Sequence, residues 1–162
     1  MNYFFVFQNK TFDKEFHGGY LWAPKGRFSH WKNMCNIKKG DIIFHSNHKK
    51  IVAVSIATSD CYEANQPKEL QIEEMWENDG WKVNCNYYLM KEPIITSDYM
   101  QDILKIQPTK YAPFNTLGRG NTGYLFDCSV KMAELFLDKL SAKNLEALTD
   151  IKMSINKKGT GC

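Results

Sequence analysis

Residues 39–58 read KGDIIFHSNHKKIVAVSIAT and carry the clearest structural signal in the chain. A turn is expected at Lys39-Gly40-Asp41, and the apolar run from there to His45 predicts a strand. The polar residues 46–50 separate this run from a second one, Ile51 to Thr58, which is rich in Val and Ile. Two such runs joined by a short polar turn predict a β-hairpin at the centre of a sheet.

Further strands and helices flank this hairpin. Apolar or alternating runs predict strands at residues 2–7, 81–90 and 123–126. Apolar residues at helical spacing predict helices at residues 97–106 and 129–140. This mixture predicts an α+β fold, in which helices lie outside a strongly bent sheet or small barrel.

Two segments lack a regular period, and both are predicted to be loops. Residues 8–19 are polar and end in Gly18-Gly19, whereas residues 109–123 contain several glycines and a proline. Long ordered loops often carry function, so the second loop is a candidate site. We expect residues 1–140 to form one domain. Residues 141–162 are expected to form a C-terminal helix and a linker-like tail.

The composition fits one soluble globular domain. Of 162 residues, 43% are hydrophobic and 24% are charged, and no apolar run is long enough to span a membrane. Five widely spaced cysteines without a CxxC pair favour reduced thiols and a cytoplasmic location. Aromatic residues make up 14% and include four Trp, which suits stacking on flat ligands. The net charge of +3 permits a polyanionic partner without requiring one.

The motifs of several enzyme classes are absent. The glycines from Gly118 to Gly123 are spaced like a dinucleotide-binding fingerprint, but they precede a predicted strand instead of following one. His45 and His48 lack the further ligands that a metal site needs. Neither the zinc-deaminase pattern nor a GxSxG nucleophile elbow occurs. We therefore expect a binding domain with no catalytic residue, no metal and no cofactor.

Two resemblances to known families sharpen this expectation. RFSHW at residues 27–31, followed by residues 39–47 and 51–57, resembles the EVE domain, which implies a PUA-like fold. Trp22 follows a short apolar run, and Trp76 and Trp81 are five residues apart before a predicted strand. This arrangement of Trp residues is similar to that of YTH domains, which share the fold and bind N6-methyladenine in an aromatic cage.

A third resemblance covers most of residues 1–140. HGGYLWAP at residues 17–24, GDIIFH at 40–45 and KYAPFN at 110–115 resemble the N-terminal specificity domains of modification-dependent restriction systems of the McrBC type. This resemblance implies recognition of a methylated base in DNA, with N6-methyladenine favoured slightly over 5-methylcytosine. It also implies partners in the form of motor or nuclease subunits.

The resemblances assign roles to individual residues. Trp22 and Trp81 are expected as cage walls, and Trp76 as a third wall or as a cover of the barrel. Polar groups that could read a base edge are Ser46, Asn47, Asp60 and Asn115; candidates for phosphate contacts are Arg119, Lys49 and Lys50. Three alternatives stay open: a stand-alone reader of modified RNA, a small nuclease and a protein-interaction domain.

Overall fold

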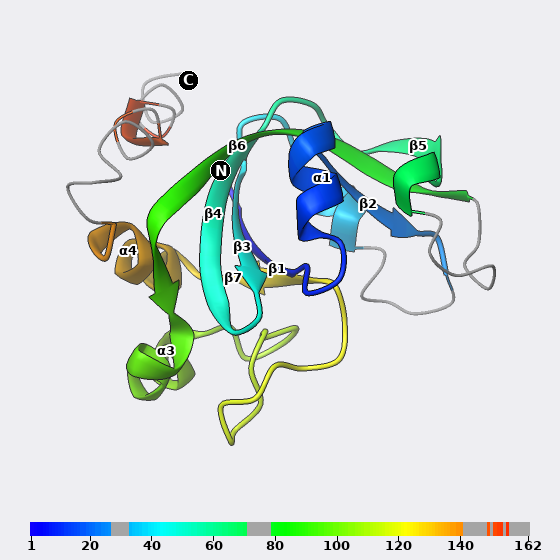
Figure 1. Cartoon of the computed structure of the whole chain (residues 1–162). Helices are drawn as coiled ribbons and strands as arrows, with labels where there is room; N and C mark the ends of the chain where they lie inside the picture. Colours follow the sequence, from blue (N-terminus) through cyan, green and yellow to red (C-terminus); the bar gives the residue numbers. More distant parts are fainter. Residues whose placement is uncertain (27–32, 71–78, 141–148, 150, 154, 156–162) are drawn as a thin grey trace.

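The computed structural model describes residues 1–26, 33–70, 79–140, 149, 151–153 and 155. Its elements, in chain order, are β1 (Tyr3–Phe7), α1 (Phe12–Gly18), β2 (Tyr20–Pro24), η1 (Asn33–Asn36), β3 (Ile42–Asn47), β4 (Lys50–Ala57), β5 (Tyr62–Asn65), η2 (Lys68–Leu70), β6 (Asp79–Ile95), η3 (Thr96–Tyr99), α3 (Met100–Ile106), β7 (Leu125–Cys128) and α4 (Val130–Asp138). The fold is α+β, as the sequence predicts: a strongly curled sheet with a few peripheral helices (Figure 1).

The strands of the described residues form one sheet in the order β2-β6-β4-β3-β1-β7, and β5 also pairs with β6. The predicted hairpin is confirmed as β3 and β4, which pair antiparallel near the middle of this order. β1 runs parallel to β3 on one side and antiparallel to β7 on the other. The sheet curls because β6 is long enough to pair with β4 through one part and with β2 and β5 through another.

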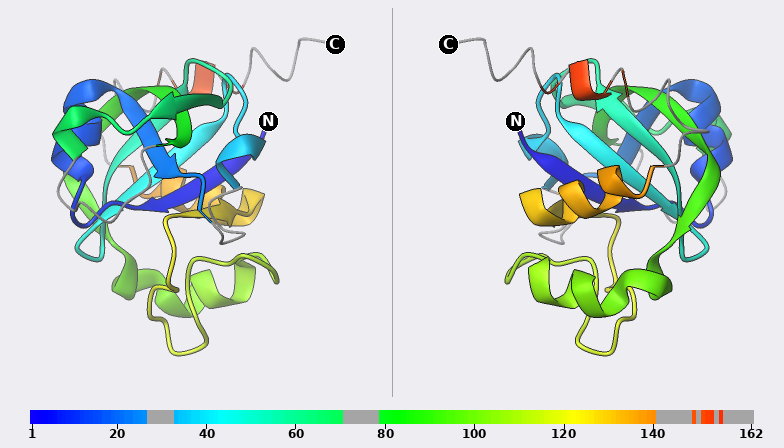
Figure 2. Two further views of the ribbon diagram at one scale, coloured as in Figure 1. Left: turned by 90° about the vertical axis from the view of Figure 1, so that its right-hand side faces the viewer. Right: turned by 90° about the vertical axis from the view of Figure 1, so that its left-hand side faces the viewer.

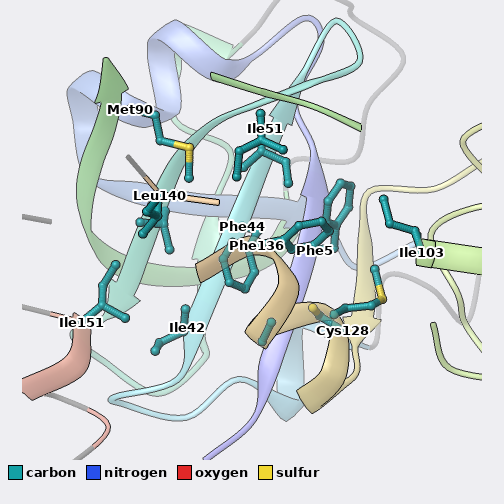
Figure 3. Close-up of a cluster of buried hydrophobic side chains, with 14 of the residues drawn as sticks. Phe5, Ile42, Phe44, Ile51, Met90, Ile103, Cys128, Phe136, Leu140 and Ile151 are labelled. Carbon is teal, nitrogen blue, oxygen red and sulfur yellow. The ribbon is translucent and has the colours of Figure 1, made fainter. Parts of the chain in front are cut away.

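Both faces of the sheet are buried, and alternation along β1 shows how. Phe5 packs on one face with Phe44 and Phe136, in the core that α3 and α4 cover (Figure 3). Phe4 and Val6 point to the opposite face and pack there with apolar residues of β2, β3, β6 and η1. Figure 2 shows α4 lying across the sheet and α3 beside the loop that leads to β7. Successive strand residues therefore serve two separate cores, as the period of two in a strand requires.

Two elements differ from the sequence-based expectation. The polar segment expected as a loop contains α1, a helix of seven residues that ends at Gly19 in the left-handed conformation. β6 continues beyond residue 90, where the expected strand ends, and includes Pro93. The ladder with β4 shifts between Ile51 and Ala53, so Pro93 lies in an irregular stretch of pairing. A proline is tolerated in such a stretch because its nitrogen, which carries no hydrogen, does not have to donate a hydrogen bond to the neighbouring strand.

Three expectations lie wholly or partly outside the described residues. These are the Trp76 wall, the RFSHW motif at residues 27–31, and most of the C-terminal helix and tail over residues 141–162.

Candidate functional site

An aromatic pocket of about 510 Å³ opens where the end of β1, the start of α1, β2 and the segment before β7 meet. Its lining includes Gln8, Thr11, Glu15, Trp22 and Tyr124. The whole lining comes from residues 7–15, Trp22, Leu70 and residues 122–124, so the pocket exists only in the folded sheet. Pockets of this size with a few convergent polar groups are typical of small-molecule and nucleotide sites.

Trp22 is the large aromatic wall of this pocket, and it is firmly held. Its side chain is only 2% exposed, and its Nε1–H donates to the carbonyl oxygen of Ala64 at 3.0 Å. Gly80 lies directly against the indole and leaves room for it. The indole is therefore fixed in position where it lines the pocket.

The floor of the pocket is polar and centres on Glu15. The Tyr124 hydroxyl donates to Glu15 Oε2 at 2.6 Å, and the Gln8 side-chain amide donates to the same oxygen. Thr11 and the backbone of Trp22 also favour the ionised form of this carboxyl group. Desolvation nevertheless dominates and raises the pKa of Glu15 to about 8, because burial disfavours the charged form more than these neighbours stabilise it.

The polar floor continues beneath the pocket as a buried network. His45 Nδ1 lies 2.7 Å from Gln8 Oε1, and His45 Nε2 lies 2.7 Å from the Ser55 hydroxyl. Since the Gln8 amide nitrogen already donates to Glu15, Gln8 Oε1 accepts and His45 carries its proton on Nδ1. Burial lowers the pKa of His45 to about 3, so the ring stays neutral and fixes the orientation of Gln8.

A second hollow, the basic pocket, adjoins the first. It has a volume of about 550 Å³ and is lined by Ser46 and Lys49 of the β3–β4 turn region, Arg119, and residues of η3 and the loop before β7. The two pockets share four lining residues: Phe7, Asn9, Thr122 and Gly123. A ligand longer than one nucleotide could therefore occupy both without leaving the surface.

The loop that carries Arg119 is ordered by its own hydrogen bonds. Asn115 Oδ1 accepts from the backbone nitrogens of Leu117 at 2.9 Å and Arg119 at 3.0 Å. A backbone bridge joins Phe114 to Gly120, and Gln107 of the preceding segment bonds both polar backbone atoms of Phe114. Asn115 thus shapes the loop, and Arg119 faces the basic pocket.

The structure brings together only part of the residues proposed from the sequence. Trp22 lines the aromatic pocket, and Ser46, Lys49 and Arg119 line the basic pocket. Trp81 does not join Trp22: the register pairs Trp22 with Lys82 and Ala23 with Trp81, so the two indoles leave opposite faces of the sheet. Trp81 packs against the core that contains Phe4 and Val6. The Lys25 Nζ atom lies over its ring, 4.9 Å from the ring centroid.

The remaining polar candidates lie apart from both pockets. Asp60 Oδ1 accepts from the backbone nitrogen of Lys39 at 2.8 Å, which holds a turn. Lys50 is exposed on β4 and lines neither pocket. Asn47 Oδ1 is buried and has no hydrogen-bond partner within the described part of the chain.

The sequence did not single out Gln8, Thr11, Glu15 or Tyr124, although all four line the aromatic pocket. Glu15 lies between Lys14 and Phe16 in a segment that looks like an ordinary polar loop. The helical spacing of Phe12, Glu15 and Phe16, two rings and an acid on one face, is a signal that could have found it.

Neither a protein-family model nor a curated protein matches this sequence. Among solved structures, the YTH domain of Zygosaccharomyces rouxii MRB1, bound to N6-methyladenosine RNA, matches with a TM-score of 0.58 and 11% identity over 87% of each chain. The Pho92 YTH domain, in complex with N6-methyladenosine, matches with a TM-score of 0.57 and 10% identity over 86% of this chain and 82% of that one.

A protein from Pseudomonas putida matches with a TM-score of 0.56 and 10% identity over 84% of this chain and 97% of that one. At this level of identity, these likenesses show the fold: this chain has a YTH-like fold. Within the described residues, no group of three or more potential metal ligands gathers, and no helix is long and apolar enough to cross a membrane.

Proposed function

We propose that this protein is a reader of methylated nucleic acid and that the modified base enters the aromatic pocket. The observation that carries the proposal is the pocket itself, in which a fixed indole stands beside a buried polar floor. The YTH-like fold supports it, because two solved domains of that fold were bound to N6-methyladenosine or to RNA that carries it. The protein acts by binding, and any cleavage or motor activity belongs to a partner or another domain.

Simple energetics explain why such a site needs both aromatic and polar groups. Burial of one methyl group contributes about 0.8 kcal/mol, and stacking on an aromatic side chain about 1–3 kcal/mol per base. Extruding a base from a duplex costs a few kcal/mol. The methyl group alone does not offset this cost, so contact with Trp22 and hydrogen bonds from the floor have to contribute.

The basic pocket suits the backbone beside the flipped nucleotide. Lys49 and Arg119 supply positive charge, while Ser46 and Asn9 supply neutral polar groups. Contacts to phosphate position a strand without reading its sequence. Because the two pockets share a wall, a nucleotide in the aromatic pocket would place its neighbour's phosphate near Lys49 and Arg119.

The finer part of the proposal concerns the nucleic acid and its biological setting. We propose DNA that carries N6-methyladenine, ahead of 5-methylcytosine, as the ligand of a specificity domain in a modification-dependent restriction system. The segments that resemble McrBC-type specificity domains support this setting. Modified RNA is the second candidate, and it is favoured by the RNA in the complex of the MRB1 YTH domain.

Fluorescence anisotropy with matched ligands tests the proposal. The ligands are a duplex with N6-methyladenine, one with 5-methylcytosine, one without modification, and single-stranded RNA with and without N6-methyladenosine. We expect tighter binding to one modified ligand than to its unmodified twin, which would also identify the base and the nucleic acid. Equal affinity within every pair would overturn the reader function.

A further inference from the structure

An apolar side chain is exposed on the loop that leads to β7. Leu117 is 77% exposed, more than any other large hydrophobic residue in the described part of the chain. Figures 1 and 2 show this loop projecting from the molecule beside α3. A single exposed leucine is normal on a protein surface, so its surroundings decide whether it has a role.

The loop holds Leu117 in a fixed position. Asn115 Oδ1 accepts from the backbone nitrogens of Leu117 and Arg119, as described above. The backbone nitrogen of Gly118 donates to the carbonyl oxygen of Asn115 at 2.9 Å, and the nitrogen of Asn115 donates to the carbonyl oxygen of Arg119 at 2.8 Å. Gly118 closes this turn with a φ of +78°, which glycine adopts without strain. Little order therefore has to be imposed on Leu117 when a ligand binds.

Leu117 is also next to the basic pocket. Its neighbours Gly118 and Arg119 line that pocket, and residues 122–123 of the same loop line both pockets. The loop thus runs from Leu117 along the basic pocket to the aromatic pocket. Tyr111 is exposed on the same loop, but neither it nor its immediate neighbours line either pocket. Leu117 is therefore the exposed apolar residue beside the proposed phosphate site.

Extrusion of a base creates a need that the two pockets do not meet. The base leaves the duplex by rotating about its own backbone, so the phosphates come to lie between the extruded base and the gap left in the stack. Proteins that distort duplexes insert apolar side chains, leucine among them, between base steps. The order on this surface is the same: the aromatic pocket, then the pocket with Lys49 and Arg119, then the exposed Leu117.

We propose that Leu117 is a wedge that fills the gap left in a duplex when the methylated base enters the aromatic pocket. Arg119, two residues further along the loop, then contacts the phosphate beside the gap. This inference rests on the proposed function and deepens it, because it assigns a base-paired duplex as the ligand. A single strand has no paired stack in which extrusion leaves a gap.

The test is fluorescence anisotropy of the full chain with three ligands that carry the same N6-methyladenine, each beside its unmodified twin. The methylated base is paired in a duplex, bulged from a duplex, or part of a single strand. Leu117→Ala should weaken binding to the paired duplex by about tenfold, because less apolar surface is buried in the gap. Binding to the other two should stay within about twofold of wild type. The pairs that flank a bulged base can close when it leaves, so no gap has to be filled.

Two further variants show whether the loss comes from the wedge. Leu117→Met keeps an apolar side chain of similar size and should bind the paired duplex as the wild type does. The matched control is Leu89→Ala on β6, because Leu89 is also exposed, at 51%, and lines neither pocket. It should leave the affinity for all three ligands unchanged.

The possible outcomes separate this inference from the reader function. An equal loss on all three ligands, an unchanged affinity for the paired duplex, or a wild type that does not bind the paired duplex would each overturn the wedge. In these cases the reader function stands if the wild type still prefers a methylated ligand to its unmodified twin. If the wild type shows no such preference with any ligand, both proposals are overturned.

Discussion

Trp22 combines two roles that usually conflict, because it lines a pocket and is also almost fully buried. Its indole is fixed by the bond to Ala64 and by close contact with Gly80. Truncation to Ala would remove a large core side chain and cost about 3–5 kcal/mol. A test of its binding role therefore needs a bulky replacement.

We expect Trp22→Leu to abolish the preference for a methylated over an unmethylated ligand. Leu fills part of the space but has no flat face, so about 1–3 kcal/mol of stacking is lost. Trp81→Leu is the matched control, because its indole lies on the other face of the sheet. Fluorescence anisotropy on both variants tests this expectation. An unchanged preference in Trp22→Leu would show that the indole does not contact the modified base.

His45 makes folding sensitive to acid. Its pKa in the folded protein is about 3, far below that of an ordinary histidine, because the charged ring would be buried. The unfolded chain therefore takes up a proton near pH 6.5 that the folded protein does not, and stability is lost as the pH falls below that value. The slope approaches about 1.4 kcal/mol per pH unit for one proton.

We expect His45→Gln to be less stable than the wild type at pH 7 and to lose less stability between pH 6.5 and pH 4.5. Urea denaturation at several pH values measures both quantities. The exposed His17, changed to Gln, is the control and should keep the wild-type slope. An identical slope in His45→Gln and the wild type would assign the acid sensitivity to other groups.

At the scale of elements, β6 couples the pocket to the rest of the sheet. Its first half pairs with β2 and β5 and its second half with β4. Gly80, near the start of β6, is where this strand meets the indole of Trp22. A Cβ atom there would lie 2.5 Å from the Ala23 carbonyl oxygen, a backbone atom that cannot move aside cheaply.

We expect Gly80→Ala to destabilise the protein by about 1–3 kcal/mol, as overpacked sites do, and to weaken ligand binding because the indole shifts. Denaturation and anisotropy on the same variant measure the two effects. Asn86→Ala, an exposed position on the same strand, should change neither by much. Wild-type stability in Gly80→Ala would show that the strand relaxes around the methyl group.

The hairpin and the other alternating strands could be predicted because apolar residues recur with a period of two, as in residues 51–58. The helix α1 could not, because it has only seven residues and no side-chain cap at Thr11. Trp22 could be proposed from its setting, but its separation from Trp81 depends on the register of β2 against β6. Register and the meeting of Gln8, Glu15 and Tyr124 are properties of the assembled sheet, which local patterns do not contain.

At the scale of the whole molecule, the net charge is only +3, but two of the basic residues, Lys49 and Arg119, line the same pocket. We expect Lys49→Ala and Arg119→Ala each to weaken binding to modified and unmodified ligands alike. Each substitution should also reduce the magnitude of the slope of log K against log salt concentration by about 1. Lys131→Ala on α4 is the control. If binding to the modified ligand alone is weakened, the residue contacts the modified base and not the phosphate backbone.

The position of β1 between β3 and β7 has a consequence for how the protein is made. Tyr3 pairs with Cys128, so β1 is synthesised long before β7, the strand that covers this edge. Until then its FFVF edge has an unfilled row of hydrogen-bonding groups, which invites pairing with other chains. Nascent chains stalled before residue 125 should therefore depend on chaperones, whereas a chain that includes β7 closes this edge itself.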